Sequence, residues 1–114
     1  MTEDVRSAFS PHDEDSPGTL EWVQAWYALQ CDGDREHDLG IDIGTLDNPG
    51  WTVKIDLKGT GVAGKPLARR ELHRSHYDWL VVWRTKGAFE AACGPLVLGE
   101  ALHTFRVWAT GDDA

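Results

Sequence analysis

The sequence is poor in cysteine and contains no long hydrophobic run. Only Cys31 and Cys93 occur among its 114 residues, which is too few for a disulfide framework and is typical of free thiols in a cytosolic domain. No apolar run approaches the roughly 18 residues that a membrane-spanning helix needs. Residues 1–18 contain no apolar signal segment. We therefore expect a cytoplasmic protein. We also expect a single domain, because a chain of this length is typical of one hydrophobic core.

Positive charge is also scarce. Lysine and arginine together number 11 against 19 aspartates and glutamates, so the formal net charge is -8 and the pI is about 4.9. Binding to nucleic acid or to an anionic membrane needs a cationic face, so this balance argues against both. It suits a basic protein partner, because complementary fields accelerate association.

The first residues differ in composition from the rest of the chain. Residues 1–18 carry five acidic side chains against Arg6 alone, together with two prolines, and this pattern predicts a flexible acidic leader. Residues 19–111 are expected to form the single domain. All six tryptophans lie in this range, and we expect most of them in the core because a buried aromatic ring removes a large apolar area from water.

Two segments have the apolar spacing of helices. In residues 20–31 the apolar side chains recur three and four positions apart, with Thr19 as the expected N-cap and Gly33 as the stop signal. A last helix is expected to begin with Pro95 at its first position and to end at Gly111. Its core stripe is Leu98, Ala101, Leu102, Phe105 and Trp108.

The residues between these helices alternate between apolar and polar, which is typical of strands. Residues 39–43 and 51–58 predict a hairpin around a turn in which Gly50 takes the positive φ of a type II turn. Further strands are expected at 67–74, 77–84 and 89–93. The apolar face of the second strand, which should pack against the last helix, is Trp51, Val53, Ile55 and Leu57.

The strand connections are too short for parallel crossovers, so the sheet should be antiparallel. The expected fold class is α+β. It consists of an antiparallel sheet of about five strands, arranged as a meander, with an N-terminal and a C-terminal helix packed on it.

Two motifs suggest chemistry that their context does not support. Gly59–Gly64 matches the G-x-G-x-x-G pattern, but a phosphate site needs a helix to begin there. Pro66 and a predicted strand follow instead, so a flexible hairpin loop is favoured. His73, His76 and Asp78 would need a tight turn to converge on a metal ion. A solvent-exposed, basic end of a hairpin is therefore favoured over a metal site. No metal or cofactor residue is assigned.

The segment 32–38 packs four carboxylates into seven residues. It is similar to the start of a calcium loop, but the twelfth position is Ile43 and not glutamate. Paired carboxylates beside His37 also suit acid–base chemistry. No nucleophile motif accompanies them, so no catalytic residue is assigned. Two interpretations stay open, a turn in which the acidic side chains hold the backbone and an acidic contact surface.

Two long motifs follow each other along the chain, one before and within this acidic segment and one around the predicted hairpin. Their residues are Trp22, Trp26, Tyr27, Gln30–Asp34, Glu36, His37, Gly40, Ile41, Thr45–Trp51, Val53, Ile55, Gly59 and Thr60, with Asp78, Trp79, Gly94 and Pro95 further on. Together they resemble the immunity protein 53 family of bacterial polymorphic toxin systems over roughly residues 20–108, nearly the whole domain. Arg35 and Leu39 stand where the family pattern favours aromatic residues.

The resemblance implies a small cytoplasmic protein that binds and neutralises a cognate toxin, with no cofactor and no reaction of its own. The negative net charge of the chain further suggests a toxin with a basic cleft, such as a nuclease, because complementary charge speeds binding. The residues expected to bind the partner are Asp32, Asp34, Glu36, His37, Asp47 and Asn48. The alternatives are a small ligand-binding or regulatory domain and an enzyme that uses the acidic segment.

Removal of residues 1–18 should leave the melting temperature almost unchanged, because a charged leader with little apolar surface contributes little to the core. Thermal unfolding of the full and shortened chains measures this. A large drop in melting temperature would show that the leader packs on the domain.

Overall fold

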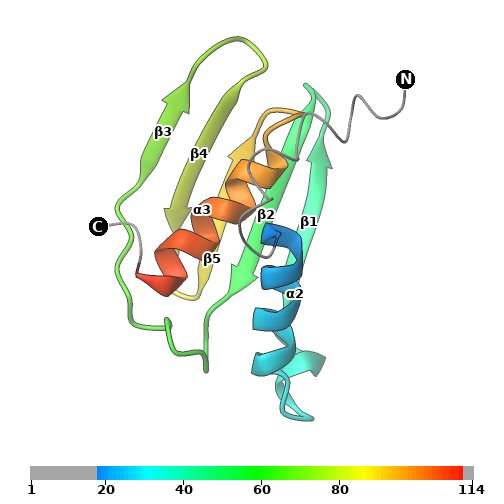
Figure 1. The fold of residues 1–114 in the computed structure, drawn as a ribbon, viewed down its shortest axis with the longest axis vertical. Coiled ribbons are helices and arrows are strands. Elements are labelled where there is room, and N and C mark those ends of the chain that lie inside the picture. Colours follow the sequence, from blue (N-terminus) through cyan, green and yellow to red (C-terminus); the bar gives the residue numbers. More distant parts are fainter. Residues whose placement is uncertain (1–17, 112–114) are drawn as a thin grey trace.

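The computed structural model describes residues 18–111. In chain order the elements of this range are α2 (Thr19–Gln30), the 3-10 helix η2 (Arg35–His37), β1 (Ile41–Leu46), β2 (Gly50–Asp56), β3 (Arg70–His73), β4 (Trp79–Arg84), β5 (Ala88–Cys93) and α3 (Leu98–Thr110). The predicted α+β class, with five antiparallel strands and a helix at either end, is confirmed (Figure 1). No helix of this range is long and apolar enough to cross a membrane.

The strands lie in the order β1-β2-β5-β4-β3, and all neighbouring pairs are antiparallel. This order differs from a simple meander because β5 inserts between β2 and β4. The connection after β2, residues 57–69, therefore runs to the far side of the sheet, where β3 lies (Figure 1). As a result β1 and β3 are the two edge strands.

The core lies between the sheet and the two helices, which share one face of the sheet (Figure 1). The predicted packing of β2 is confirmed, since Val53, Ile55 and Leu57 are at most 2% exposed and Trp51 packs half-buried against them. From α3 the core receives Leu102, Phe105 and Trp108. The two α2 tryptophans, Trp22 and Trp26, meet the Phe105 ring edge-on at centroid distances of 6.0 and 5.0 Å.

The expectation that most tryptophans fill the core is correct only in part. Trp108 is fully buried, and the other five are partly exposed. Leu80 and Val82 of β4 point toward the helices, in register with Cys93 and Ala91 of β5. Alternation therefore places Trp79, Val81 and Trp83 on the opposite face of the sheet. The strand is therefore apolar on both faces, although the helices cover only one of them (Figure 1).

The helix ends differ from the prediction in three places. Gly18 is the N-cap of α2, and Thr19 lies inside the helix without a capping bond. The helix ends at Cys31 in an extended conformation, so Gly33 does not terminate it. Pro95 precedes α3, whose N-cap is Val97. The C-terminal prediction is confirmed, because Gly111 adopts φ 81° at the α3 C-cap. Apart from Gly18, the predicted leader lies outside the described residues.

Two strand predictions also need correction. The predicted strand 67–74 is paired only over Arg70–His73, because the crossing connection takes up the residues before it. Ile43 is one of the alternating apolar residues of the predicted strand 39–43, which should face the core, but it is 44% exposed, since β1 is an edge strand. Both cysteines are free as expected. Burial raises the pKa of the Cys93 thiol to about 11, whereas Cys31 is exposed.

Gly50 has a structural role other than the predicted one. The glycines with positive φ among the described residues are Gly33, Gly59 and Gly111, so the type II assignment at Gly50 is wrong. Gly50 is the first residue of β2 and pairs with Leu46. A β-carbon at Gly50 would overlap the carbonyl oxygen of Cys93. Glycine is therefore required by the close approach of β5.

Gly50→Ala should lower the free energy of unfolding by about 1–3 kcal/mol, the usual range for overpacking, because its methyl group would overlap the Cys93 carbonyl oxygen. Gly61→Ala is the matched control, since a β-carbon there has no atom within 4 Å. Urea unfolding followed by tryptophan fluorescence measures both variants. Equal stability of the two would contradict the close approach.

Candidate functional site

The acidic segment 32–38 forms a loop that connects α2 to β1 and contains η2. Asp32 Oδ1 accepts hydrogen bonds from the amides of Asp34 at 2.9 Å and Arg35 at 2.8 Å. The Glu36 carboxylate accepts the amides of Asp32 at 3.0 Å and Gly33 at 2.9 Å. Two of the four carboxylates are therefore engaged by the backbone of their own loop.

These bonds lower the pKa of both carboxyl groups. For Asp32 the main cause is the amide of Arg35, followed by that of Asp34. For Glu36 it is the residue's own amide, together with the amides of Asp32 and Gly33. Because the folded pKa lies below the unfolded value, the stability that these groups contribute is present at neutral pH. It is lost as the pH falls through the folded pKa.

Arg35 ties this loop to the end of β2. Its Nε donates to the carbonyl oxygen of Lys58 and its guanidinium Nη2 donates to that of Asp56, both at 2.9 Å. The Asp56 carboxylate in turn accepts the amide of Gly40 at 2.8 Å. The acidic loop is thus held against the sheet from two sides, by Arg35 and by the backbone that leads into β1.

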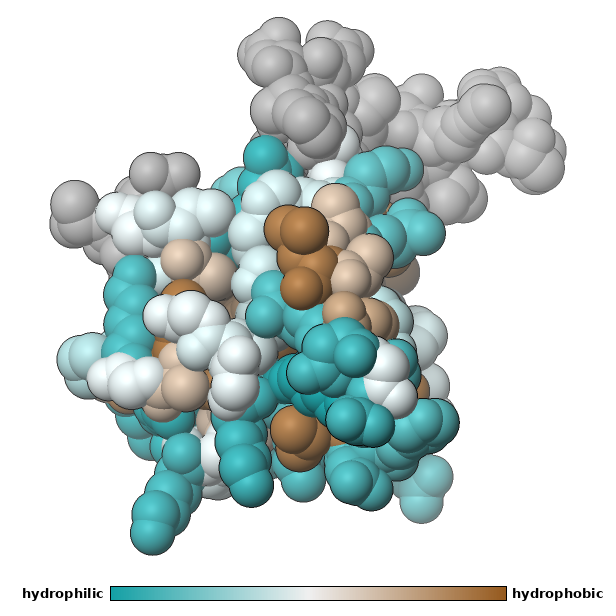
Figure 2. Space-filling model, turned by 90° about the horizontal axis from the view of Figure 1, so that it is seen from below, coloured by the Kyte–Doolittle hydropathy of each residue, from teal (hydrophilic) through white to brown (hydrophobic). Residues whose placement is uncertain are grey.

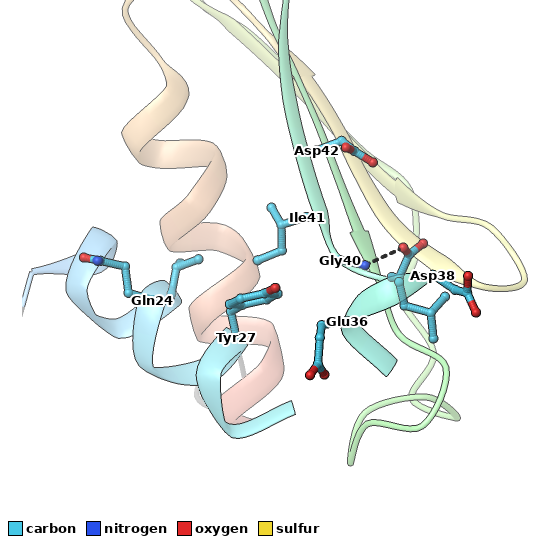
Figure 3. Close-up of a pocket in the computed structure, with 10 residues that line it drawn as sticks. Gln24, Tyr27, Glu36, Asp38, Gly40, Ile41 and Asp42 are labelled. Atoms are coloured by element: carbon cyan, nitrogen blue, oxygen red, sulfur yellow. Dashed lines mark hydrogen bonds between the residues drawn. The ribbon is translucent and has the colours of Figure 1, made fainter. Parts of the chain in front are cut away.

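An open cleft of about 490 Å³ lies between α2, the acidic loop and the start of β1. Figure 3 shows Tyr27 reaching from α2 toward Ile41 and Gly40, with the carboxylate of Asp42 turned outward along β1. Its lining residues are Val23, Gln24, Tyr27, Glu36, Asp38, Leu39, Gly40, Ile41, Asp42 and Asp56. Four of these carry carboxylates and none carries a basic group. The cleft therefore combines an apolar wall with negative charge.

The end of the molecule that carries this loop is seen in Figure 2. Hydrophilic side chains dominate there, and hydrophobic side chains form small, separate patches between them. A surface of this kind suits a polar, charged contact better than a large apolar one.

The structure brings together only part of the predicted site. Asp34 and His37 lie exposed on the acidic loop beside Asp32 and Glu36, and the Asp34 side chain does not cap η2. Asp47 and Asn48 are exposed at the opposite end of the β1–β2 hairpin. The length of β1, about 17 Å at the usual rise per residue, separates the two groups.

Sequence reasoning missed three of the carboxylates around the cleft. Asp42 was visible as the polar partner of Ile41 in the alternating pattern. Asp38 lies within the acidic segment but is not among the predicted contact residues. Asp56 had no local signal, because only the pairing of β2 with β1 brings it beside Gly40. The apolar wall from α2 likewise depends on how the helix sits on the sheet.

A second cavity of about 640 Å³ lies at the opposite end of the molecule, near the Asp47–Asn48 turn. Arg74 there pairs with Asp78 at 2.8 Å and with Glu100 at 2.6 Å, so its charge is compensated. Tyr77 is 54% exposed and Leu96 is 86% exposed. The other residues that line this second cavity are Pro49, Ser75, Pro95 and Val97. This end presents apolar surface, whereas the acidic cleft presents charge.

The motifs set aside from the sequence have structural roles. Gly59–Gly64 is not followed by a helix, and it belongs to the crossing connection and not to a hairpin. Arg84 donates to the carbonyl oxygens of Ala63, at 3.0 Å, and Lys65. The Trp108 indole donates to Pro66 at 2.9 Å. The glycine-rich connection is therefore fastened to β4 and α3.

The histidine segment is also engaged within its own surroundings. His73 pairs with Glu71 at 3.1 Å, and Asp78 pairs with Arg74. Within residues 18–111 no group of three or more His, Cys, Asp or Glu side chains is arranged to hold a metal ion.

Comparison with known proteins agrees with the resemblance noted in the sequence. The family model of immunity protein 53 matches residues 20–110, which includes both helices, the acidic loop and all five strands. No curated protein and no solved structure matches the chain.

Arg35→Lys should lower the free energy of unfolding by about 1–2 kcal/mol, because a single ammonium cannot bridge the carbonyl oxygens of Asp56 and Lys58 as the guanidinium fork does. Amide exchange in residues 32–40 should also become faster. Arg70→Lys, at an exposed arginine of β3, is the control and should change stability by no more than about 0.5 kcal/mol. The tether would be refuted if both variants unfolded at the same urea concentration.

Proposed function

The chain belongs to the immunity protein 53 family, and on that premise we propose that it protects its producing cell by binding a cognate polymorphic toxin directly and blocking it. Immunity requires recognition and not turnover. The engagement of Asp32 and Glu36 by backbone amides supports a binding role over a catalytic one, since an acid–base pair needs carboxyl groups that are available to a substrate.

The observation that carries this proposal is the acidic cleft beside the 32–38 loop. Four acidic residues and no basic residue line it, and the chain as a whole has a net charge of -8. Such a surface attracts a basic patch from a distance and speeds its capture. We propose that the toxin presents such a patch, and a nuclease with a basic active cleft fits this requirement.

The residues proposed to meet the toxin have different roles. Asp34 and His37 are exposed on the loop and are proposed as direct contacts. Asp32 and Glu36 hold the loop in shape and add negative charge. Asp47 and Asn48 are proposed as a second contact at the far end of the hairpin. A loop that is already fixed by its own hydrogen bonds loses little entropy on binding.

A small ligand-binding or regulatory domain is the alternative that one observation favours. The cleft volume of about 490 Å³ lies within the range of small-molecule sites. A metabolite or metal that raises the melting temperature of the purified protein would support this alternative.

The double variant Asp34→Asn with Asp38→Asn tests the toxin proposal. It removes two charges and retains the side-chain shapes, so the association rate with the toxin domain encoded beside the gene for this chain should fall roughly three- to tenfold and depend less on salt. Stopped-flow binding at several salt concentrations measures this.

The matched control is Glu21→Gln with Glu90→Gln, which removes two charges away from the cleft and should change the association rate far less. If both double variants bound the toxin domain as fast as the parent, the acidic loop would be excluded as the contact. If the parent itself did not bind this domain, the proposed partner would be wrong.

A further inference from the structure

The outer edge of β1 carries backbone groups that have no strand beside them in the described part of the chain. The amide of Asp56 donates to the carbonyl oxygen of Gly40 at 3.0 Å, which sets the phase of the β1–β2 ladder. In an antiparallel pair, residues alternate between those bonded to the partner and those that face away. The amides and carbonyls of Ile41, Ile43 and Thr45 therefore point outward.

The two edges of the sheet differ in how they are protected. The other edge strand, β3, is four residues long, fully exposed and rich in charge, with Arg70, Glu71 and His73. Short length and charged side chains hinder the addition of another strand. β1 is six residues long, pairs with β2 without a bulge and carries Asp42 as its single charged residue. Ile43 adds an apolar side chain that is 44% exposed.

We propose that an extended segment of the toxin pairs with this outer edge of β1 and becomes a sixth strand of the sheet. This inference rests on the function proposed above and specifies where and how the toxin binds. Strand addition supplies affinity through main-chain hydrogen bonds, and the side chains at alternate positions supply specificity.

The position of β1 accounts for the separation of the two polar patches. The acidic loop lies before its first residue, and the Asp47–Asn48 turn follows its last (Figure 1). A toxin strand of about six residues would run the roughly 17 Å between them and touch both. Neither patch needs to form a site alone, because the strand between them provides continuous contact.

Charge determines the kind of segment that fits. Asp38 and Asp42 lie at the start of β1, where the Asp42 carboxylate is turned outward (Figure 3), so a lysine or arginine of the added strand would be neutralised there. On the side of the sheet that the helices share, Ile43 favours an apolar neighbour. A second copy of this chain is a poor occupant, because it would bring the same carboxylates and a net charge of -8 against the first.

Hydrogen exchange in the complex tests this directly. In the parent protein bound to the toxin domain encoded beside its gene, the amides of Ile41, Ile43 and Thr45 should exchange about tenfold or more slowly than in the free protein. The β3 amides serve as the internal control and should not change. Protection confined to other segments, with 41–45 unchanged, would overturn the inference while leaving the proposed function intact.

Ile43→Pro removes one outward amide without removing a bond to β2, and proline is tolerated at such edge positions. Toxin affinity should fall by about tenfold or more, whereas Ile43→Val, which keeps the amide, should bind within about twofold of the parent. Near-ultraviolet circular dichroism establishes whether the proline variant is folded. If it is not, the exchange measurement decides.

Three outcomes would contradict strand addition, the toxin as the occupant of the edge, and the proposed function, respectively. Equal toxin binding by a folded proline variant and the parent would overturn strand addition. A free protein that sediments as a dimer and becomes monomeric on Ile43→Pro would assign the edge to a second copy and overturn the toxin as its occupant. Failure of the parent to bind the toxin domain would refute the proposed function itself, and it is measured before any variant is compared.

Discussion

The pairing of β5 with both β2 and β4 is the interaction on which the rest of the structure depends. It joins the β1–β2 hairpin to the β3–β4 hairpin in one sheet. Its residues are mostly small or fully buried, and glycine is required at two positions around its C-terminal end. A β-carbon at Gly50 would overlap the Cys93 carbonyl oxygen, and one at Gly94 would overlap that of Tyr77. The insertion also leaves β1 at the free edge beside the acidic loop.

The negative charge of the chain is divided between structure and surface. The carboxylates of Asp32 and Glu36 fix the acidic loop through its amides, and Arg35 fastens that loop to β2. Other acidic groups, such as Asp34 and Asp38, remain exposed on the resulting rigid support. Both interpretations that the sequence left open are thus compatible, because some carboxylates hold the backbone and their neighbours face solvent. Arg35, which departs from the aromatic residue that the family pattern favours, is what connects the loop to the sheet.

The two ends of the sheet offer different surfaces, and β1 joins them. One end has the cleft lined by four acidic residues, and the other has exposed Tyr77 and Leu96 beside the ion pairs of Arg74 with Asp78 and Glu100. Binding through charge at one end and main-chain pairing along the edge would combine rapid capture with specific register, since long-range fields act on association and short-range contacts act on dissociation. The opposite edge, β3, is short and charged and lacks these properties.

The sequence by itself determined the fold class, the β1–β2 hairpin, the buried face of β2 and the α3 C-cap at Gly111, because period-two and period-3.6 patterns and a left-handed glycine are local properties. The sequence also showed the cluster of four carboxylates in residues 32–38 that forms the acidic loop. Only the tertiary structure decided that β5 also pairs with β2, since β2 is distant from β5 in sequence and the strand pattern does not encode the order of the strands. That placement decided that Gly50 serves close packing. The tertiary structure also decided which face of β4 meets the helices, which leaves Trp79 and Trp83 on the other face, and the pairing of β2 with β1 brought Asp56 to the cleft. The length of β1 separates Asp47 and Asn48 from the acidic loop, because the loop precedes this strand and the turn follows it.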